Sequence, residues 1–130
     1  MPHEAPAGTE PEYLRIVRHY EDCLRRHGDT HRGVAGPDEQ DPRRRYRVML
    51  DIVGQRPCPG PPELLDVGCG AGHLLEHMRR VGFAARYQGI DLSPDFVALC
   101  RRKFPAENFL RIDLLASPGD DPRAAFVIAN

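Results

Sequence analysis

The spacing of apolar residues along the chain changes near residue 63. Before it, apolar residues recur at intervals of three and four in two stretches: Tyr13, Val17, Tyr20 and Leu24, then Tyr46, Met49, Leu50 and Val53. This spacing is typical of helices with one buried face. The first predicted helix has Thr9 as N-cap, in a capping box with Glu12, and ends at Gly28. The second runs from Asp41 to Gly54.

From residue 63 on, short apolar runs alternate with helical spacing. Strands are predicted at 64–67, 86–90, 109–112 and 124–129, with helices after the first and second strands. Such alternation indicates parallel βαβ units. We therefore expect an α/β fold, a parallel sheet with strand order 3-2-1-4 preceded by two helices. Residues 1–62 are expected to form a helical cap that ends in a proline-rich linker, and residues 63–130 a partial Rossmann-like domain.

Composition narrows the function classes. Eighteen basic and nineteen acidic residues leave a net charge of −1, which does not favour a nucleic-acid or membrane-surface binder. The sequence has no run of about 18 apolar residues that would span a membrane. Its four cysteines are widely spaced and form no Cys-x-x-Cys pair, a pattern that fits a reducing cytoplasm better than a zinc site or disulfides.

The most informative segment is the glycine-rich turn at residues 66–72, between the first strand and its helix. Glycine allows a cofactor to approach the backbone closely. The spacing is Gly-x-Gly-x-Gly, because His73 stands where the dinucleotide fingerprint requires Gly or Ala. Asp91 follows Gly72 by nineteen residues and ends the second strand, where a carboxylate is placed to accept hydrogen bonds from ribose hydroxyls.

Four segments resemble the motifs of class I S-adenosylmethionine (SAM)-dependent methyltransferases. Residues 65–72 (LDVGCGAG) are similar to the first motif, 89–93 (GIDLS) to the second, 111–115 (RIDLL) to the third and 125–130 (AFVIAN) to the fourth. Residues 26–51 resemble, less specifically, the helical leader of bacterial small-molecule methyltransferases.

The resemblance implies a set of residues that contact SAM and its product, S-adenosylhomocysteine: Asp66, Gly68, Cys69, Gly70, Gly72, Asp91, Leu92, Asp113, Leu114 and Asn130. Asp66 and the glycines would serve the methionine end, and Asp91 the ribose. Leu92, Asp113 and Leu114 would surround the adenine, and Asn130 would face the sulfonium.

The same resemblance predicts methyl transfer to a small molecule. The family has a seven-stranded sheet, and this sequence reaches only the fourth strand, so the C-terminal half of the fold is expected to be absent. An uncovered strand at 124–129 predicts a homo-oligomer or a partner at that edge.

Two functions are alternatives to methyl transfer: a non-catalytic SAM-binding or interaction module, and a nicotinamide-dependent oxidoreductase. No catalytic base is predicted.

Several other residues have two interpretations. His73 and His77 have the spacing of metal ligands on a helix, but no third ligand is evident, so no metal site is expected.

The four arginines at 43–45 and 47 would hold an anionic substrate or form a solvated helix face. Tyr13, Tyr20 and Tyr46 are expected in the core, with one of them over SAM as the alternative. Cys69 is expected to be a packing residue in the turn and not a nucleophile.

Overall fold

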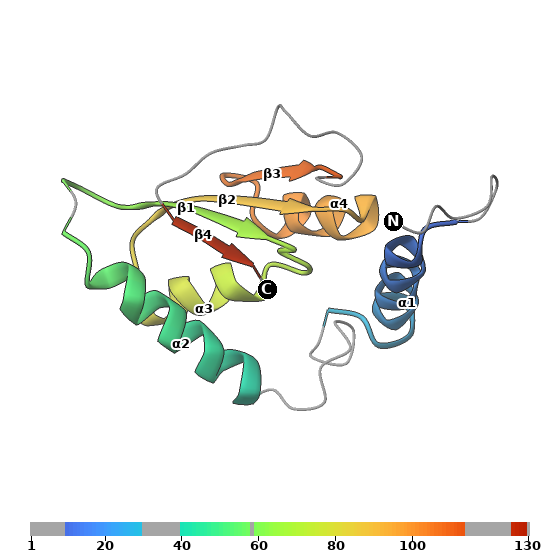
Figure 1. Cartoon of the computed structure of the whole chain (residues 1–130), viewed down its shortest axis with the longest axis horizontal. Coiled ribbons are helices and arrows are strands. Elements are labelled where there is room, and N and C mark those ends of the chain that lie inside the picture. The colour runs from blue at the N-terminus through green and yellow to red at the C-terminus, as the bar shows by residue number, and fades with distance from the viewer. Residues whose placement is uncertain (1–9, 30–39, 58, 114–125, 130) are drawn as a thin grey trace, which may run out of the picture.

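A four-stranded parallel sheet forms the centre of the molecule. The computed structural model describes residues 10–29, 40–57, 59–113 and 126–129. The strands are β1 (Glu63–Val67), β2 (Arg86–Asp91), β3 (Asn108–Arg111) and β4 (Phe126–Ala129). They pair in the order β3-β2-β1-β4, which confirms the predicted topology (Figure 1).

The register brings the ends of the strands to one edge. Val67 of β1 pairs with Ile90 of β2 on one side and with Ala129 of β4 on the other. Because all pairings are parallel, the glycine turn after β1 and Asp91 at the end of β2 emerge at the same carboxyl edge. Ligands of open α/β sheets bind at this edge.

Three helices share one hydrophobic core with the sheet. They are α2 (Gln40–Gly54), α3 (His73–Val81) and α4 (Pro94–Lys103). Ser93 caps α4, because its Oγ accepts a hydrogen bond from the Phe96 amide at 3.3 Å. The buried core residues of the three helices include Tyr46, Leu50 and Val53 of α2, Leu74, Leu75 and Met78 of α3, and Val97 and Cys100 of α4.

The first helix, α1 (Glu12–His27), differs from its sequence-based expectation. It contains no buried residue, and Tyr20 is 39% exposed. The prediction that Tyr13 and Tyr20 belong to the core is therefore wrong, whereas Tyr46 is buried as expected. The predicted capping box is also wrong: Pro11 is the N-cap, so Glu12 is the first helical residue and not the third. Thr9 lies outside the described residues.

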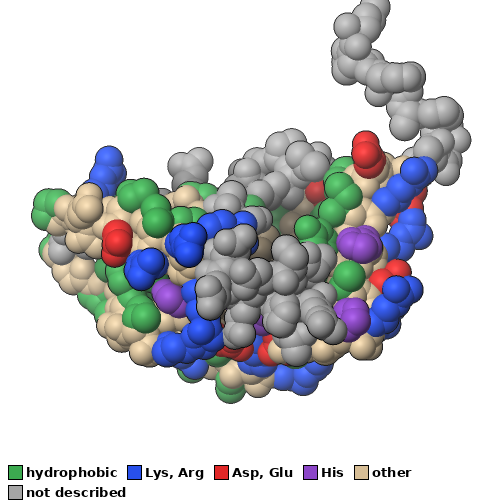
Figure 2. All heavy atoms as spheres, turned by 90° about the horizontal axis from the view of Figure 1, so that it is seen from below, with side chains coloured by type: hydrophobic (Ala, Val, Ile, Leu, Met, Phe, Trp, Pro, Cys, Tyr) green, Lys and Arg blue, Asp and Glu red, His purple; other side chains and the backbone are tan. Residues whose placement is uncertain are grey.

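In space, α1 stands beyond the arrowheads of β1 and β2, at the carboxyl edge of the sheet (Figure 1). Figure 2 views the molecule from the side on which α2 lies, and Lys and Arg side chains are prominent on this face. No helix in the described part of the chain is long and apolar enough to cross a membrane.

The close packing of β2 against β3 generates a first prediction. A Cβ atom at Gly89 would lie 2.7 Å from the Phe109 ring and 3.0 Å from the Tyr87 hydroxyl. Gly89→Ala should therefore destabilise the protein by about 1–3 kcal/mol through overpacking. Urea unfolding measures the change.

Gly54→Ala is the matched control, because its Cβ would meet only Phe83 at 3.8 Å. Alanine also suits the end of a helix better than glycine, so this variant should lose no stability. Equal losses in the two variants would contradict the packing argument.

Candidate cofactor site at the carboxyl edge of the sheet

The turn after β1 depends on glycine for two physical reasons. Gly70 has a φ of 55°, in the left-handed region that residues with a Cβ rarely adopt. Gly72 has a φ of 78° and is the N-cap of α3. A Cβ at Gly72 would also lie 2.8 Å from the Phe104 ring, so a side chain there is excluded by space as well.

Hydrogen bonds fasten this turn to the end of β2. The amides of Gly68 and Cys69 both donate to the Ile90 carbonyl, at 2.9 and 3.0 Å. The Gly70 amide donates to Oδ2 of Asp91 at 2.9 Å. The ladder between β1 and β2 thus continues past the strands and fixes the turn relative to Asp91.

Asp91 lies where the sequence places it, at the carboxyl end of β2. Its other oxygen, Oδ1, accepts a hydrogen bond from the Ser93 amide at 2.9 Å. Burial raises the pKa of Asp91, and the backbone donors at Ser93, Gly70 and Leu92 oppose this rise. A carboxylate oxygen has two lone pairs, so each oxygen keeps acceptor capacity beyond its backbone donor.

Asp66 is more deeply placed than its sequence motif indicates. It has no exposed surface, and its Oδ2 accepts a hydrogen bond of 2.6 Å from the Tyr87 hydroxyl. Burial and the neighbouring Asp66 carboxylate raise the pKa of Tyr87, which keeps Tyr87 as the donor. The Asp66 carboxylate therefore links β1 to β2 within the core.

Two thiols pack behind the turn. Cys69 and Cys100 are both buried, and the Cys100 thiol donates to the Gly70 carbonyl at 3.1 Å. The hydrogen bond with Cys100 and burial raise the pKa of Cys69. A thiol with a raised pKa is a poor nucleophile. This environment fits the interpretation of Cys69 as a packing residue of the turn.

The residues predicted around the adenine are described only in part. Leu92 and Asp113 are half-buried near the ends of β2 and β3. Oδ2 of Asp113 accepts a hydrogen bond from the Tyr13 hydroxyl at 3.2 Å. Leu114 and Asn130 lie outside the described residues, so their assignments remain predictions.

From the sequence, a contact from α1 to this edge entered only as the alternative that a tyrosine lies over SAM. Tyr13 contacts Asp113, and Glu21 accepts a hydrogen bond from the Ser93 hydroxyl at 2.5 Å. α1 thus contacts Asp113 directly, and it contacts Ser93, which follows the predicted cofactor residues Asp91 and Leu92. In the sequence, the amphipathic pattern of α1 indicates that one face of this helix packs against another part of the chain.

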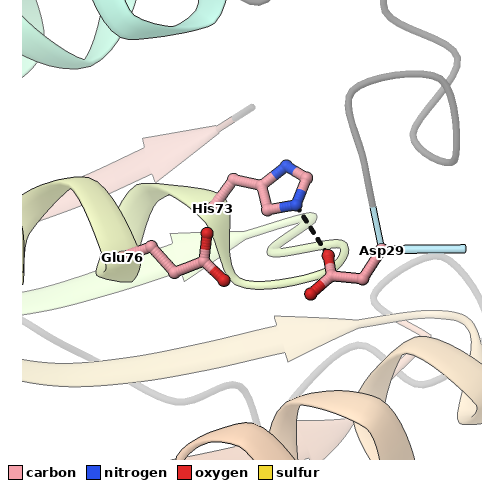
Figure 3. A group of neighbouring side chains, drawn as sticks. All are labelled: Asp29, His73 and Glu76. Atoms are coloured by element: carbon pink, nitrogen blue, oxygen red, sulfur yellow. Dashed lines mark hydrogen bonds and ion pairs between the residues drawn. The ribbon is translucent and has the colours of Figure 1, made fainter.

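After α1, Asp29 joins a polar network beside the turn. Its Oδ1 lies 2.8 Å from Nε2 of His73, and Glu76 projects toward the same place (Figure 3). Oxygen and nitrogen atoms of these three residues lie within 4.8 Å of one another, close enough to hold a metal ion. His77, which shares a metal-ligand spacing with His73 in the sequence, is not part of this group, because its ring packs against Tyr46 at 5.6 Å.

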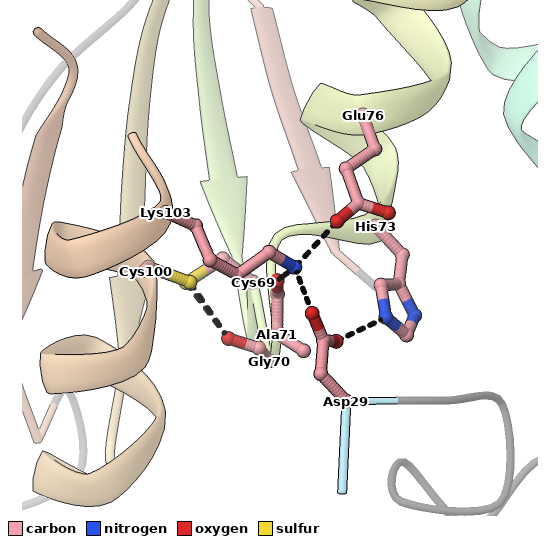
Figure 4. A network of polar contacts seen from close by, with 8 residues as sticks. All are labelled: Asp29, Cys69, Gly70, Ala71, His73, Glu76, Cys100 and Lys103. Atoms are coloured by element: carbon pink, nitrogen blue, oxygen red, sulfur yellow. Dashed lines mark hydrogen bonds and ion pairs between the residues drawn. The ribbon is translucent and has the colours of Figure 1, made fainter. Parts of the chain in front are cut away.

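The Lys103 ammonium supplies the positive charge in this network (Figure 4). Its Nζ lies 2.6 Å from Asp29, 2.5 Å from Glu76 and 2.5 Å from the Ala71 carbonyl. A metal ion would compete with Lys103 for the same carboxylates, so we assign no metal here. The network instead links Asp29 to the turn and to α4.

Asp29 and Lys103 of this network have shifted pKa values. Burial alone would raise the pKa of Asp29, but hydrogen bonds from Lys103 and His73 outweigh burial and lower it. Burial alone would lower the pKa of Lys103, but hydrogen bonds to Asp29 and Glu76 outweigh burial and raise it. The ion pair is therefore more favourable in the folded protein than in the unfolded chain.

Residues 64–130 match the family described as "Methyltransferase domain". The chain belongs to this methyltransferase family. Segments of it are 33% identical to the trans-aconitate 2-methyltransferase of Rhodopseudomonas palustris (strain BisB18) and 44% identical to the ubiquinone biosynthesis O-methyltransferase of Xanthomonas axonopodis pv. citri (strain 306). The first match covers 54% of this chain and 27% of that protein, and the second covers 42% and 22%.

Solved methyltransferase structures share the fold. The magnesium protoporphyrin IX methyltransferase of Synechocystis PCC 6803, solved with bound SAM, matches with a TM-score of 0.62 and 22% identity, over 95% of this chain and 64% of that one. A TehB-like SAM-dependent methyltransferase from Corynebacterium glutamicum matches with a TM-score of 0.57 and 20% identity, over 88% and 55%. This methyltransferase chain thus spans about a quarter of the two curated relatives and over half of the two solved ones.

The network around Lys103 generates a second prediction. Lys103→Met should lower the stability of the methyltransferase domain by about 1–2 kcal/mol, between the values for exposed and buried ion pairs. The pKa of Asp29 is lowered, so its contribution is complete above the unfolded value of about 3.9 and is lost on further acidification. The pKa of Lys103 is raised, so its contribution is complete below about 10.4 and is lost on further alkalinisation.

The stability difference between wild type and Lys103→Met should therefore be constant between about pH 5 and 9 and shrink on both sides. Chemical unfolding at a series of pH values measures it. Arg102→Met removes an exposed cation from the same helix and serves as the control. A difference that does not change between about pH 3 and 7 would contradict the role given to Asp29.

Proposed function

We propose that this chain is the cofactor-binding part of a SAM-dependent methyltransferase that acts on a small molecule and releases S-adenosylhomocysteine. The observation that carries the proposal is the glycine turn of β1 hydrogen-bonded to Asp91 at the end of β2, in a chain of the methyltransferase family. This arrangement presents a bare backbone and an acceptor carboxylate at the edge where α/β proteins bind ligands.

The residues present fit such a cofactor. Both Asp91 oxygens keep acceptor capacity for the ribose hydroxyls, and half-buried Leu92 beside it offers an apolar surface for the adenine. Asp113 would accept from the adenine amino group, with Leu114 beside the ring. Asp66, Cys69 and the glycines at 68, 70 and 72 would shape the methionine end, and Asn130 would face the sulfonium.

The donors of the turn favour SAM over a dinucleotide. A pyrophosphate needs free amide groups in this turn and at the helix N-terminus. Here the amides of Gly68, Cys69 and Gly70 donate to β2, and that of Gly72 donates to the Cys69 carbonyl. The turn itself thus has few free donors for a pyrophosphate, and His73 stands where the dinucleotide fingerprint requires Gly or Ala, so both features weigh against the nicotinamide-dependent oxidoreductase. A competition between NAD and S-adenosylhomocysteine for binding would decide between the two.

The acceptor is proposed to be a small molecule. When bound, SAM supplies a methyl group already activated by its sulfonium. The chain then has to hold the acceptor in line with that group, an alignment that by itself accelerates transfer. Two relatives are named for trans-aconitate and for ubiquinone biosynthesis, which supports a small acceptor. The net charge of −1 does not favour a nucleic acid.

Calorimetric titration with SAM, combined with a methyl-transfer assay on the same protein, tests the proposal. Binding with transfer supports the enzyme. Binding without transfer to a panel of small acids, phenols and quinols would favour the alternative, a SAM-binding or interaction module. No binding of either SAM or S-adenosylhomocysteine would refute both.

Asp91→Ala provides a sharper test of the ribose assignment. Loss of an acceptor for two hydroxyls should weaken SAM binding by roughly 1.5–3 kcal/mol, the scale for hydrogen bonds to a charged group. Calorimetry measures the affinity, and thermal unfolding shows whether the variant is folded. Asp95→Ala removes an exposed carboxylate four residues away and should bind SAM normally. Unchanged affinity in Asp91→Ala would remove Asp91 from the site.

We also propose that another copy of the chain or a partner covers β4. Within the described sheet β4 is an outer strand, and Val127 on it is 60% exposed. Light scattering should show a species larger than the monomer, and Val127→Lys should shift it toward the monomer, because charge disfavours edge pairing. A monomeric wild type would contradict this.

The free thiols at Cys23, Cys69 and Cys100 support a cytoplasmic location.

A further inference from the structure

A basic cavity is lined by residues of α2 and α3, none of which is assigned to SAM. Its volume is about 230 Å³, and it is lined by Arg43, Arg44, Arg47 and His77. Lys and Arg side chains stand out on the face that carries α2 (Figure 2). Among the described residues that line the cavity none is acidic, so its walls carry positive charge.

The position of these arginines is not explained by helix stability. They lie within the first eight of the fifteen residues of α2, whereas its last turn contains no basic residue. The N-terminus of a helix carries a partial positive charge, so cations are unfavourable there and favourable at the other end. A local arrangement that opposes the helix dipole is more often found where the residues serve a ligand.

His77 adds a second observation from the facing helix. Its Nδ1 atom is buried and has no hydrogen-bond partner within the described part of the chain. Burial lowers the pKa of His77, and the charges of Arg80, Arg43 and Arg47 lower it further. An anion in the cavity would offset the positive charges of the arginines that surround His77.

We propose that this cavity binds the carboxylate or phosphate group of a small anionic molecule. Guanidinium groups pair with both kinds of oxyanion through two parallel hydrogen bonds. The volume is below the roughly 300 Å³ at which sites for drug-sized ligands begin, so it suits a compact anion or the anionic end of a larger molecule. No lining residue is shared with the proposed SAM site, so the proposal does not depend on methyl transfer.

Nuclear magnetic resonance titration of the protein with inorganic phosphate, and separately with citrate, tests the site. The ring signals of His77, assigned by their loss in His77→Gln, should shift with saturation, and the pKa of His77 should rise when the anion is bound. The double variant Arg43→Gln and Arg47→Gln should bind at least about tenfold more weakly, equivalent to about 1.4 kcal/mol.

Arg45→Gln is the matched control. Arg45 is an exposed residue of the same helix that does not line the cavity. Its loss removes one positive charge, half of what the double variant removes, and should alter affinity less than about twofold. A saturable response to one anion only would support the site and identify its ligand class. The proposal is overturned by an equal loss in Arg45→Gln, by a response that sodium chloride reproduces, or by no response up to about 10 mM anion.

Discussion

The hydrogen bonds between the glycine turn and the end of β2 set the geometry of everything around them. Ile90 accepts from two successive amides of the turn, and Asp91 accepts from the next one. Because Asp91 also accepts from Ser93, one carboxylate holds both the turn that leads into α3 and the residue that caps α4. The first residues of α3 and of α4 are therefore both positioned by the ends of β1 and β2.

The order of apolar runs and glycines in the sequence predicts the strands and the glycine turn well. Short apolar runs that stop at glycine or aspartate determine where the strands end, and parallel pairing then brings Gly70 and Asp91 together. The buried Asp66–Tyr87 contact was not predictable in this way. It depends on which side chains of neighbouring strands face the same side, and that follows from register and not from composition.

Contacts of the N-terminal segment were harder still to predict. Asp29 and Lys103 are separated by more than seventy residues, and nothing in the local sequence of either indicates the other. The spacing of apolar residues in an amphipathic helix does not reveal whether its apolar face enters a core or lies over a polar edge. For this reason Tyr46 was placed correctly, whereas Tyr13, which contacts Asp113, was not.

The attachment of α1 has a consequence for how a ligand reaches the edge of the sheet. The helix has no buried side chain, and its described links to this edge are polar contacts such as Tyr13 to Asp113 and Glu21 to Ser93. Water can replace such contacts at small cost. Displacing α1 is thus a local opening that leaves the hydrophobic core closed, and a bound molecule can exchange with solvent without global unfolding of the chain.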